Sequence, residues 1–276
     1  MTWHAKLDID YRVESARTVA RHQHTGPLRV LQSLYPEGDA ICHNVLVHPP
    51  GGLVGGDTLD ISVTASGRAH GLITTPGATR FYRSAGDLAV QQTRLTLHDE
   101  ARLEWLPLEA ICHNGCLAQN HLTLTLGAQA EFIGWDITAF GLPEAGLPFV
   151  NGGFLQHIEM PGIWLERGQV DAADTRLMDG PLGLTGQRCM ASLFFACGAN
   201  LERHRREAGL DLARQLIAAH ALHATAGATC PNPQVMVVRV LSPLVEPASN
   251  LLRQVWAAWR AHFWQLPATA PRLWST

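Results

Sequence analysis

Apolar side chains recur at every second position in several short stretches, and this period of two limits the possible folds more than any other feature of the chain. Residues 7–13 alternate in this way, as do residues 59–63 and 122–126. Successive side chains of a strand point to opposite faces of a sheet, so these stretches predict strands with one buried and one solvated face.

Clusters of glycine and proline separate the alternating stretches. Residues 49–52 read PPGG, residues 55–57 read GGD, and residues 152–153 are both glycine. Glycine supplies positive φ angles and proline stops a helix, so such clusters are typical of turns. Short strands separated by turns predict a mainly β, β-rich body over residues 1–188.

The pattern changes in the last third of the chain. Residues 191–196 form an apolar run, residues 200–223 are helical in pattern, and residues 235–241 again favour a strand. A second helix is predicted from an apolar face at helical spacing, made by Leu252, Val255, Trp256, Trp259 and Phe263. We therefore predict a mixed region with two α-helices over residues 189–276.

No Gly/Ser-rich linker divides the chain, so residues 1–276 are treated as a single domain.

The charge of the chain argues against nucleic-acid binding. The formal net charge is −3 and the sequence pI is about 6.5, whereas nucleic-acid-binding domains carry a basic surplus. The basic run at residues 203–206 lies in a helical stretch and is interpreted as a solvated face. Nucleic acid is not an expected partner.

Location is predicted from what the chain lacks. Residues 1–10 have no apolar segment of signal-peptide type, and no stretch has the length of a membrane-spanning helix. A cytoplasmic protein without a membrane partner is expected. In that reducing compartment the six cysteines are interpreted as thiols or metal ligands rather than as disulfides.

The common signatures of enzymes are absent from the sequence. There is no G-x-S-x-G elbow, no H-E-x-x-H helix and no dinucleotide fingerprint. Residues 51–56 are rich in glycine, but no Lys-Ser/Thr pair follows them and they lead into an alternating stretch rather than a helix. We interpret them as a tight connection between strands.

One pentapeptide, Ala-Ile-Cys-His-Asn, occurs at residues 40–44 and again at residues 110–114. Thiolate and imidazole suit Zn(II) and Ni(II), so Cys112, His113 and Cys116 are candidate metal ligands, and a metallochaperone is one possible function. Neighbouring residues of a strand point to opposite faces, however, so Cys112 and His113 cannot share an ion in a regular strand. Buried cysteines are the alternative interpretation.

Two carboxylates stand in apolar surroundings, where burial of a charge is costly unless it has a partner. Asp136 follows Phe-Ile-Gly-Trp, and Glu166 follows Ile-Trp-Leu and precedes Arg167. An ion pair with Arg167 or the capping of a turn would make them structural. A carboxylate pair of glycosidase type is the enzymatic alternative, and it requires both groups to face a cleft.

Several segments, taken in order, resemble the UreD (also called UreH) family of urease accessory proteins, and together they span nearly the whole chain. The segments are residues 26–30 (GPLRV), 35–38 (YPEG), 48–57 (HPPGGLVGGD), 74–84 (TTPGATRFYRS), 103–107 (LEWLP), 134–136 (GWD), 165–167 (LER) and 271–274 (PRLW). The chain departs from the family pattern at residues 110–116, where the second Cys-His pair stands.

The resemblance implies a β-helix-like body of stacked sheets and a protein without catalytic activity of its own. It implies partners of three kinds: a UreF-type accessory protein, a UreG-type GTPase and apo-urease. Nickel would then pass transiently through the protein, with no tightly bound cofactor. The family pattern assigns this passage to Asp136 and Glu166, followed by Asp57 and Thr79. Spaced oxygen ligands suit transit, because a tight cage would stop the ion.

Overall fold

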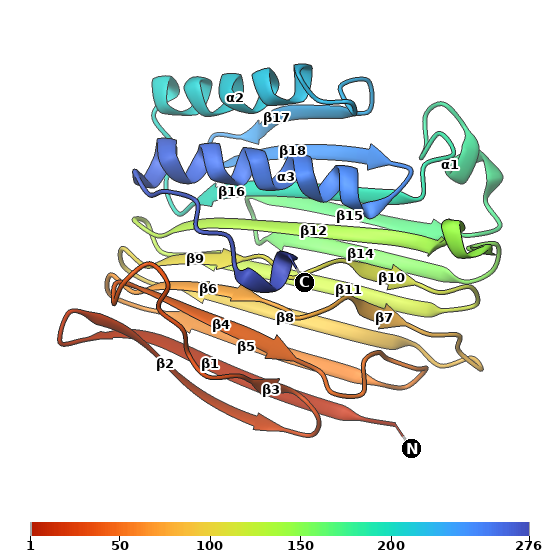
Figure 1. Ribbon diagram of the computed structural model, residues 1–276, viewed down its shortest axis with the longest axis horizontal. Coiled ribbons are helices and arrows are strands. Elements are labelled where there is room, and N and C mark those ends of the chain that lie inside the picture. The colour runs from red at the N-terminus through yellow and green to blue at the C-terminus, as the bar shows by residue number, and fades with distance from the viewer. Residues whose placement is uncertain (1, 276) are drawn as a thin grey trace.

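The computed structural model describes residues 2–275, which form two β-sheets stacked face to face with helices along one side (Figure 1). One sheet has seven strands and the other has eleven. The alternating stretches found in the sequence all lie in strands, so that part of the prediction is confirmed. The mainly β fold class is confirmed as well.

The seven-stranded sheet contains five parallel strands in its middle and an antiparallel strand at each edge. In spatial order its strands are β15 (Trp164–Asp171), β14 (Gly153–Met160), β11 (Leu117–Leu126), β8 (Ala89–Leu97), β5 (Thr58–Ala65), β1 (His4–Glu14) and β2 (Arg17–Thr25).

The eleven-stranded sheet has a parallel half and an antiparallel half. Its main path is β17 (Ala226–Asn232), β18 (Val235–Ser242), β16 (Cys189–Cys197), β12 (Glu131–Leu142), β9 (Arg102–Trp105), β6 (His70–Thr74), β4 (Ile41–Val47) and β3 (Arg29–Val30). Three short strands flank that path: β7 (Thr79–Phe81), β10 (Ala110–Cys112) and β13 (Leu147–Pro148).

The chain crosses from one sheet to the other at almost every turn of the body. From β4 to β14 the longer strands belong alternately to the eleven-stranded and the seven-stranded sheet, and each strand pairs in parallel with the one a full coil earlier. This is the arrangement of a flattened β-solenoid, and it confirms the β-helix-like prediction. In such a fold each coil contributes one strand to each sheet, and one face of each strand points inward.

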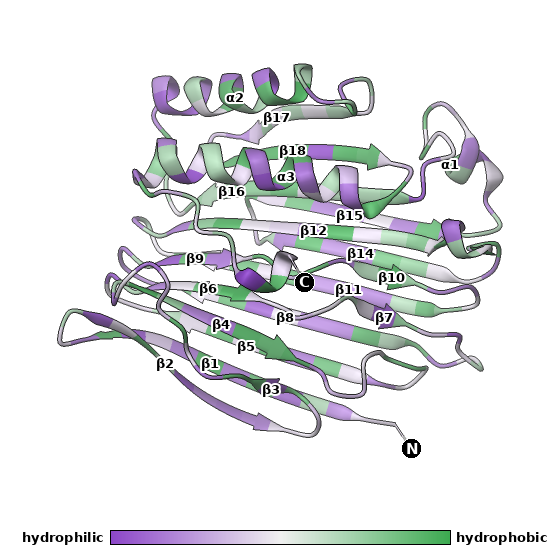
Figure 2. Cartoon of the chain, viewed as in Figure 1, coloured by the Kyte–Doolittle hydropathy of each residue, from purple (hydrophilic) through white to green (hydrophobic). Residues whose placement is uncertain are grey.

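The space between the sheets is filled mainly by apolar side chains. Strand β5 shows the pattern, with buried Leu59, Ile61 and Val63 between half-buried polar neighbours. Figure 2 shows the same alternation of hydrophobic and hydrophilic residues along the strands of both sheets. A polar residue at an inward position of this layer therefore departs from the pattern of apolar side chains inward and polar side chains outward.

Helices cover the outer face of the eleven-stranded sheet near its antiparallel half (Figure 1). Helix α2 (Arg203–Ala218) is shorter than the predicted stretch, and α3 (Val245–Trp259) continues into a π-helical turn at Arg260–Trp264. A five-residue helix, α1 (Thr175–Asp179), was not predicted. Single-turn 3-10 helices occur at Pro143–Ala145 and Arg272–Ser275.

The predicted apolar face of the last helix is buried against this sheet. All five of its side chains belong to a second core cluster between α3 and the sheet, and none is more than 5% exposed. The stripe is therefore internal packing, as amphipathic helices usually provide, rather than a free interface.

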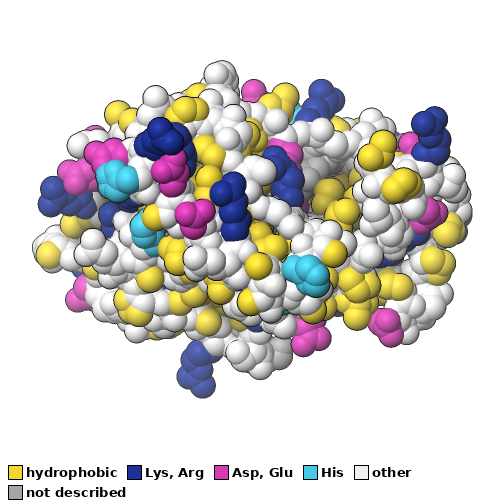
Figure 3. All heavy atoms as spheres, turned by 90° about the horizontal axis from the view of Figure 1, so that it is seen from above, with side chains coloured by type: hydrophobic (Ala, Val, Ile, Leu, Met, Phe, Trp, Pro, Cys, Tyr) yellow, Lys and Arg dark blue, Asp and Glu magenta, His cyan; other side chains and the backbone are white. Residues whose placement is uncertain are grey.

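The outward face of α2 carries charges of both signs. Arg203 pairs with Glu207 at 2.7 Å, and Arg214 lies 3.6 Å from Asp211. In Figure 3, which looks down on this end of the molecule, basic and acidic side chains are interspersed. Arg203 and His204 of the basic run are thus exposed, whereas Arg205 turns inward and donates to Glu131 Oε1 at 2.7 Å. Among the described residues, no helix is long and apolar enough to cross a membrane.

Candidate functional site

Two rows of polar side chains face each other in the middle of the apolar layer between the sheets. On the seven-stranded sheet, Gln91, Asn120 and Gln156 stand side by side in register on β8, β11 and β14. On the opposite sheet, Asp136 of β12 is in register with Ser192 of β16. We call these five residues the polar seam. It runs across the strands rather than along them.

Asp136 is the centre of the seam because three neutral donors converge on its carboxylate. Asn120 Nδ2 donates to Oδ2 at 2.7 Å, Gln156 Nε2 donates to Oδ1 at 2.6 Å, and the Thr138 hydroxyl donates to Oδ1 at 3.1 Å. Gln91 Nε2 extends the chain by donating to Asn120 Oδ1 at 3.3 Å. No Lys, Arg or His within residues 2–275 forms an ion pair with Asp136.

This environment raises the pKa of Asp136 to about 6. Burial is the main cause, because it disfavours the charged form, and the negative charge of Glu166 adds to it. The hydrogen bonds from Thr138, Gln156 and Asn120 oppose the rise by stabilising the carboxylate. Asp136 is therefore mostly ionised at neutral pH and becomes neutral in mild acid. It is a negative charge without a positive partner.

Glu166 lies at one end of the seam and is ion-paired. Its carboxylate accepts hydrogen bonds from Arg239 of β18, with Arg239 Nε at 3.0 Å from Oε2, and from the Ser192 hydroxyl at 3.3 Å. The partner suggested by the sequence, Arg167, points to the other face of β15, because adjacent residues of a strand alternate. Ser192 thus connects Asp136, its neighbour in register, to Glu166.

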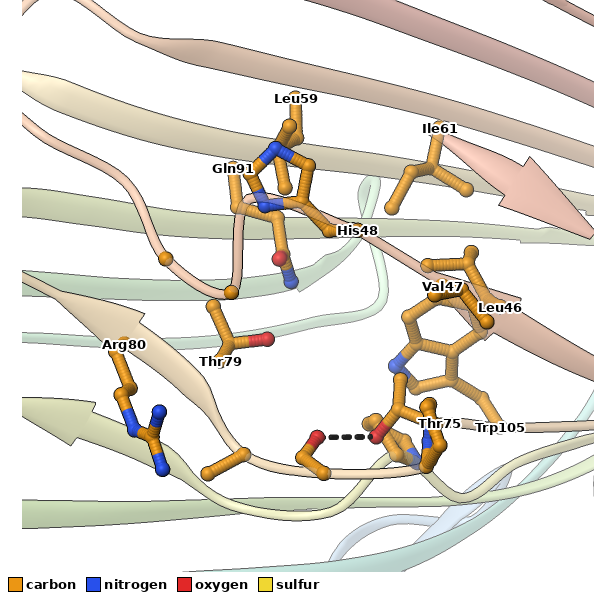
Figure 4. A pocket seen from close by; sticks show the side chains of 16 residues that line it. Leu46, Val47, His48, Leu59, Ile61, Thr75, Thr79, Arg80, Gln91 and Trp105 are labelled. Carbon is orange, nitrogen blue, oxygen red and sulfur yellow. Dashed lines mark hydrogen bonds between the residues drawn. The ribbon is translucent and has the colours of Figure 1, made fainter. Parts of the chain in front are cut away.

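A pocket of about 230 Å³ lies at the other end of the seam. Gln91 is part of its lining and so joins the pocket to the seam. Thr79, His48 and Trp105 line it as well, and Figure 4 shows their polar groups arranged around the space between the loops that follow β4 and β6. Burial lowers the pKa of His48, and its Nε2 atom is buried without a hydrogen-bond partner in the protein.

Asp57 holds a turn rather than joining the seam. Its Oδ1 accepts from the backbone amide of Trp3 at 2.8 Å, and its Oδ2 accepts from the amide of Val54 at 2.9 Å. Both oxygens are therefore used to fix the glycine-rich connection that leads into β5. Its charge still acts on the pocket, where it opposes the lowering of the pKa of His48.

The two Cys-His segments do not pair with each other, because β4 pairs with β3 and β6, whereas β10 pairs with β7 and β12. In the second segment, Cys112 and Cys116 are fully buried, and burial raises the pKa of the Cys112 thiol. His113 instead stacks on Tyr82, with ring centroids 5.0 Å apart. Within residues 2–275 no group of three or more His, Cys, Asp or Glu side chains is arranged to hold a metal ion.

Sequence reasoning missed the amide members of the seam. Gln91, Asn120 and Gln156 each occupy an inward position of an alternating strand, and the inward neighbours of Asn120 and Gln156 on their own strands are buried and apolar. A polar residue in the inward phase was the available signal. Only the stacking of the coils, however, shows that the three lie side by side.

A family model described as UreD urease accessory protein matches residues 4–275. The chain belongs to this family. It is 68% identical over 275 residues to the urease accessory protein UreD of Polaromonas naphthalenivorans (strain CJ2), and the match covers all of both chains. It is 66% identical over 276 residues to that of Variovorax paradoxus (strain S110), again over the full length of both. With that of Leptothrix cholodnii it shares 52% identity over 278 residues, also over the whole of both chains.

Membership of the UreD family agrees with the arrangement of the two carboxylates. A glycosidase pair requires both groups to face a substrate, whereas in this UreD-family chain Glu166 is bound by Arg239 and Ser192. The family's description is that of an accessory protein in urease maturation.

Proposed function

We propose that this UreD-family chain is a non-catalytic assembly factor that conducts Ni(II) along the polar seam toward apo-urease. The pocket beside Thr79 and His48 would form one mouth of the route, and the Glu166–Arg239 pair would form the other. The observation that carries the proposal is the Asp136 carboxylate, which sits inside an apolar layer and has neutral hydrogen-bond donors but no cationic partner.

The electrostatics of the seam favour a cation in its interior. A carboxylate removed from water is costly unless a positive charge compensates it, and Asp136 receives only partial dipolar compensation from amides and a hydroxyl. A dication at this point would lower that cost. Its neighbours Asn120 and Gln156 are at most 8% exposed, so bulk water does little to compensate the charge.

The ligands of the seam suit transit better than storage. Oxygen atoms of Asp136, Asn120, Gln156 and Ser192 are hard donors, and each strand offers one of them. Ni(II) held by a complete nitrogen and sulfur cage would be released slowly, whereas spaced oxygen ligands allow it to move from one to the next.

The two ends have different chemistry. At the pocket, burial keeps the His48 imidazole neutral and its Nε2 lacks a protein partner, so the nitrogen is free to meet an arriving ion. At the other end, the Arg239 guanidinium is hydrogen-bonded to the Glu166 carboxylate, and a dication would have to displace it. We propose that this competition delays escape of the ion until a partner surface is present.

We also propose a UreF-type accessory protein, a UreG-type GTPase and apo-urease as the partners, in a cytoplasmic assembly. The family resemblance supports these partners. The net charge of −3 gives no reason to add a nucleic acid to them.

The proposal is tested by producing the complete urease cluster in cells with Asp136→Ala or Glu166→Ala in this chain. Recovered urease is assayed for nickel, and the UreF-type partner is quantified in a pull-down of the variant. We expect lower nickel content with partner binding retained. Asp8→Ala is the matched control, because Asp8 lies on the outer face in an exposed ion pair with Lys6.

Wild-type nickel loading with both Asp136→Ala and Glu166→Ala would overturn the passage. Loss of partner binding would instead make Asp136 and Glu166 structural residues. Either result is informative only beside a normal Asp8→Ala control.

A further inference from the structure

Two histidines lie side by side on the outer face of the seven-stranded sheet, away from the polar seam. His121 of β11 is in register with His157 of the neighbouring parallel strand β14. Their ring centroids are 5.3 Å apart and the ring planes are inclined by 33°. The seam residues Asn120 and Gln156 precede them in sequence, so the two imidazoles point to the opposite face.

Each imidazole is anchored through one ring nitrogen. His157 Nε2 lies 2.9 Å from Glu159 Oε2, and His121 Nε2 lies 3.0 Å from Gln119 Oε1. Carboxylate and amide oxygens accept hydrogen bonds, so each Nε2 carries the proton and each Nδ1 keeps its lone pair. Histidines that bind metals commonly donate their other N–H to such an oxygen, which fixes the tautomer and the ring.

The surroundings of His121 favour its metal-binding form at neutral pH. Burial lowers the pKa of His121, and the neighbouring His157 and Arg167 lower it further. A neutral imidazole is the form that binds a metal. Two charged groups face the pair from its own strands and from β15: Glu159, which attracts a cation, and Arg167, which repels one.

We propose that His121 and His157 form a two-imidazole site for a borderline divalent ion of the Ni(II) or Zn(II) class. Imidazole nitrogen is a favoured ligand for these ions, and Glu159 is close enough to act as an outer carboxylate. With two protein ligands, the remaining coordination positions belong to water or to a partner's side chain. The site is therefore exchangeable, and it is separate from the seam because the sheet lies between them.

A second pair of histidines provides a matched control. His22 and His24 of β2 are stacked with centroids 6.3 Å apart, but Arg29 Nη1 lies 3.2 Å from His24 Nδ1. A guanidinium only donates, so it uses the lone pair of that nitrogen. This pair also consists of two neighbouring histidines, but the Nδ1 lone pair of His24 is already used by Arg29 and cannot bind a metal.

The test titrates Ni(II) into the metal-free full-length protein at pH 7.5 by calorimetry. We expect His121→Asn/His157→Asn to lose one exchangeable equivalent that His22→Asn/His24→Asn retains, and Glu159→Gln to bind roughly 10-fold more weakly. Asp136→Asn should retain the same equivalent, which separates this site from the passage. With Cu(II) as a probe, electron spin echo spectra should show two coordinated imidazoles in the wild type and none from this pair in the double variant.

Unchanged stoichiometry in His121→Asn/His157→Asn would overturn the site, as would an equal loss in His22→Asn/His24→Asn. All four histidines lie on outer or edge positions of the sheet, so the substitutions should leave the fold intact. Thermal unfolding of each variant verifies this.

Discussion

Two regions of this molecule bury polar groups in opposite ways. Beneath α3 and its π-helical turn, Arg260 and Glu104 are fully buried and lie in direct contact, with Nε of the arginine 3.3 Å from Oε1 of the glutamate. In the polar seam, Asp136 is held only by neutral donors. In the first region the carboxylates contact a cation that belongs to the protein, and in the second Asp136 contacts none.

The ion-paired region, which we call the Arg260 network, ties the C-terminal segment to the solenoid. Glu37 accepts from Arg260 Nη2 at 2.9 and 3.1 Å, and His43 lies 2.8 Å from the same carboxylate. Glu104 binds His70 at 2.8 Å and accepts from the Trp256 indole at 2.6 Å. Every charged group here has a partner that belongs to the protein itself.

The buried carboxylates of the Arg260 network are paired with a cation of the protein and stabilise the fold. The Asp136 carboxylate has no such partner, and its burial costs free energy. Removal of one member of a paired set leaves an uncompensated charge in a dry place, which is strongly destabilising. Removal of an unpaired carboxylate takes away a charge that the fold tolerates at a cost. Substitutions in the two regions should therefore have opposite effects on stability.

The largest effect is expected for Arg260→Met. Loss of the guanidinium leaves Glu37 and Glu104 without their cation, at a cost of about 4 kcal/mol, and the thermal midpoint should fall by roughly 10 °C. Arg214→Met is the control, because its ion pair with Asp211 is exposed. Equal thermal midpoints for Arg260→Met and the wild type would contradict the claim that Arg260 stabilises the fold by compensating the two buried carboxylates.

A matched pair of carboxylate-to-amide changes sharpens the contrast. Glu104→Gln should unfold at lower denaturant concentration than the wild type, because it loses its charge against Arg260. Asp136→Asn should be as stable as the wild type or slightly more stable at pH 7.5, because it removes an unpaired charge. The midpoints of urea unfolding measure both, and the same direction of change for the two variants would contradict the contrast.

The pH dependence of stability provides a smaller effect with a definite sign. The pKa of Asp136 is raised from 3.8 in the unfolded chain to about 6 in the folded protein, so the folded state binds more protons in that window. The contribution of this group to stability is complete below pH 3.8 and declines as the pH rises to about 6.

Asp136→Asn should therefore gain stability relative to the wild type between about pH 4 and pH 6, by about 1 kcal/mol after allowance for solvent screening, and change no further above pH 7. Unfolding curves of the two proteins across this range give the difference directly. A difference that does not vary with pH would show that the carboxylate is paired after all.

The smallest effect is expected for Cys112→Ala/Cys116→Ala. These thiols are buried and lie apart from His113, so their removal should leave the nickel content of matured urease unchanged while lowering stability modestly. Loss of nickel loading in a folded double variant would favour the metallochaperone function instead.

The alternation of residues 7–13, 59–63 and 122–126 was sufficient to predict strands, because a half-buried strand has a period of two whatever its partners are. The stacking into a solenoid came from the family resemblance. The seam could not be assembled from the sequence, since its hydrogen-bonded residues are between 16 and 29 positions apart and lie on different strands. The Arg260 network spans 223 residues between Arg260 and Glu37, and no local pattern marks it.

The most direct test of the central claim is the initial rate of nickel incorporation into purified apo-urease, measured with Asp136→Asn and Glu104→Gln at equal concentrations of folded protein. If the unpaired carboxylate carries the ion, Asp136→Asn should be slower than the wild type by about 10-fold or more, the loss expected for one charged ligand worth about 1.4 kcal/mol. Glu104→Gln should match the wild type once the folded fraction is equal. A wild-type rate with Asp136→Asn would contradict the account.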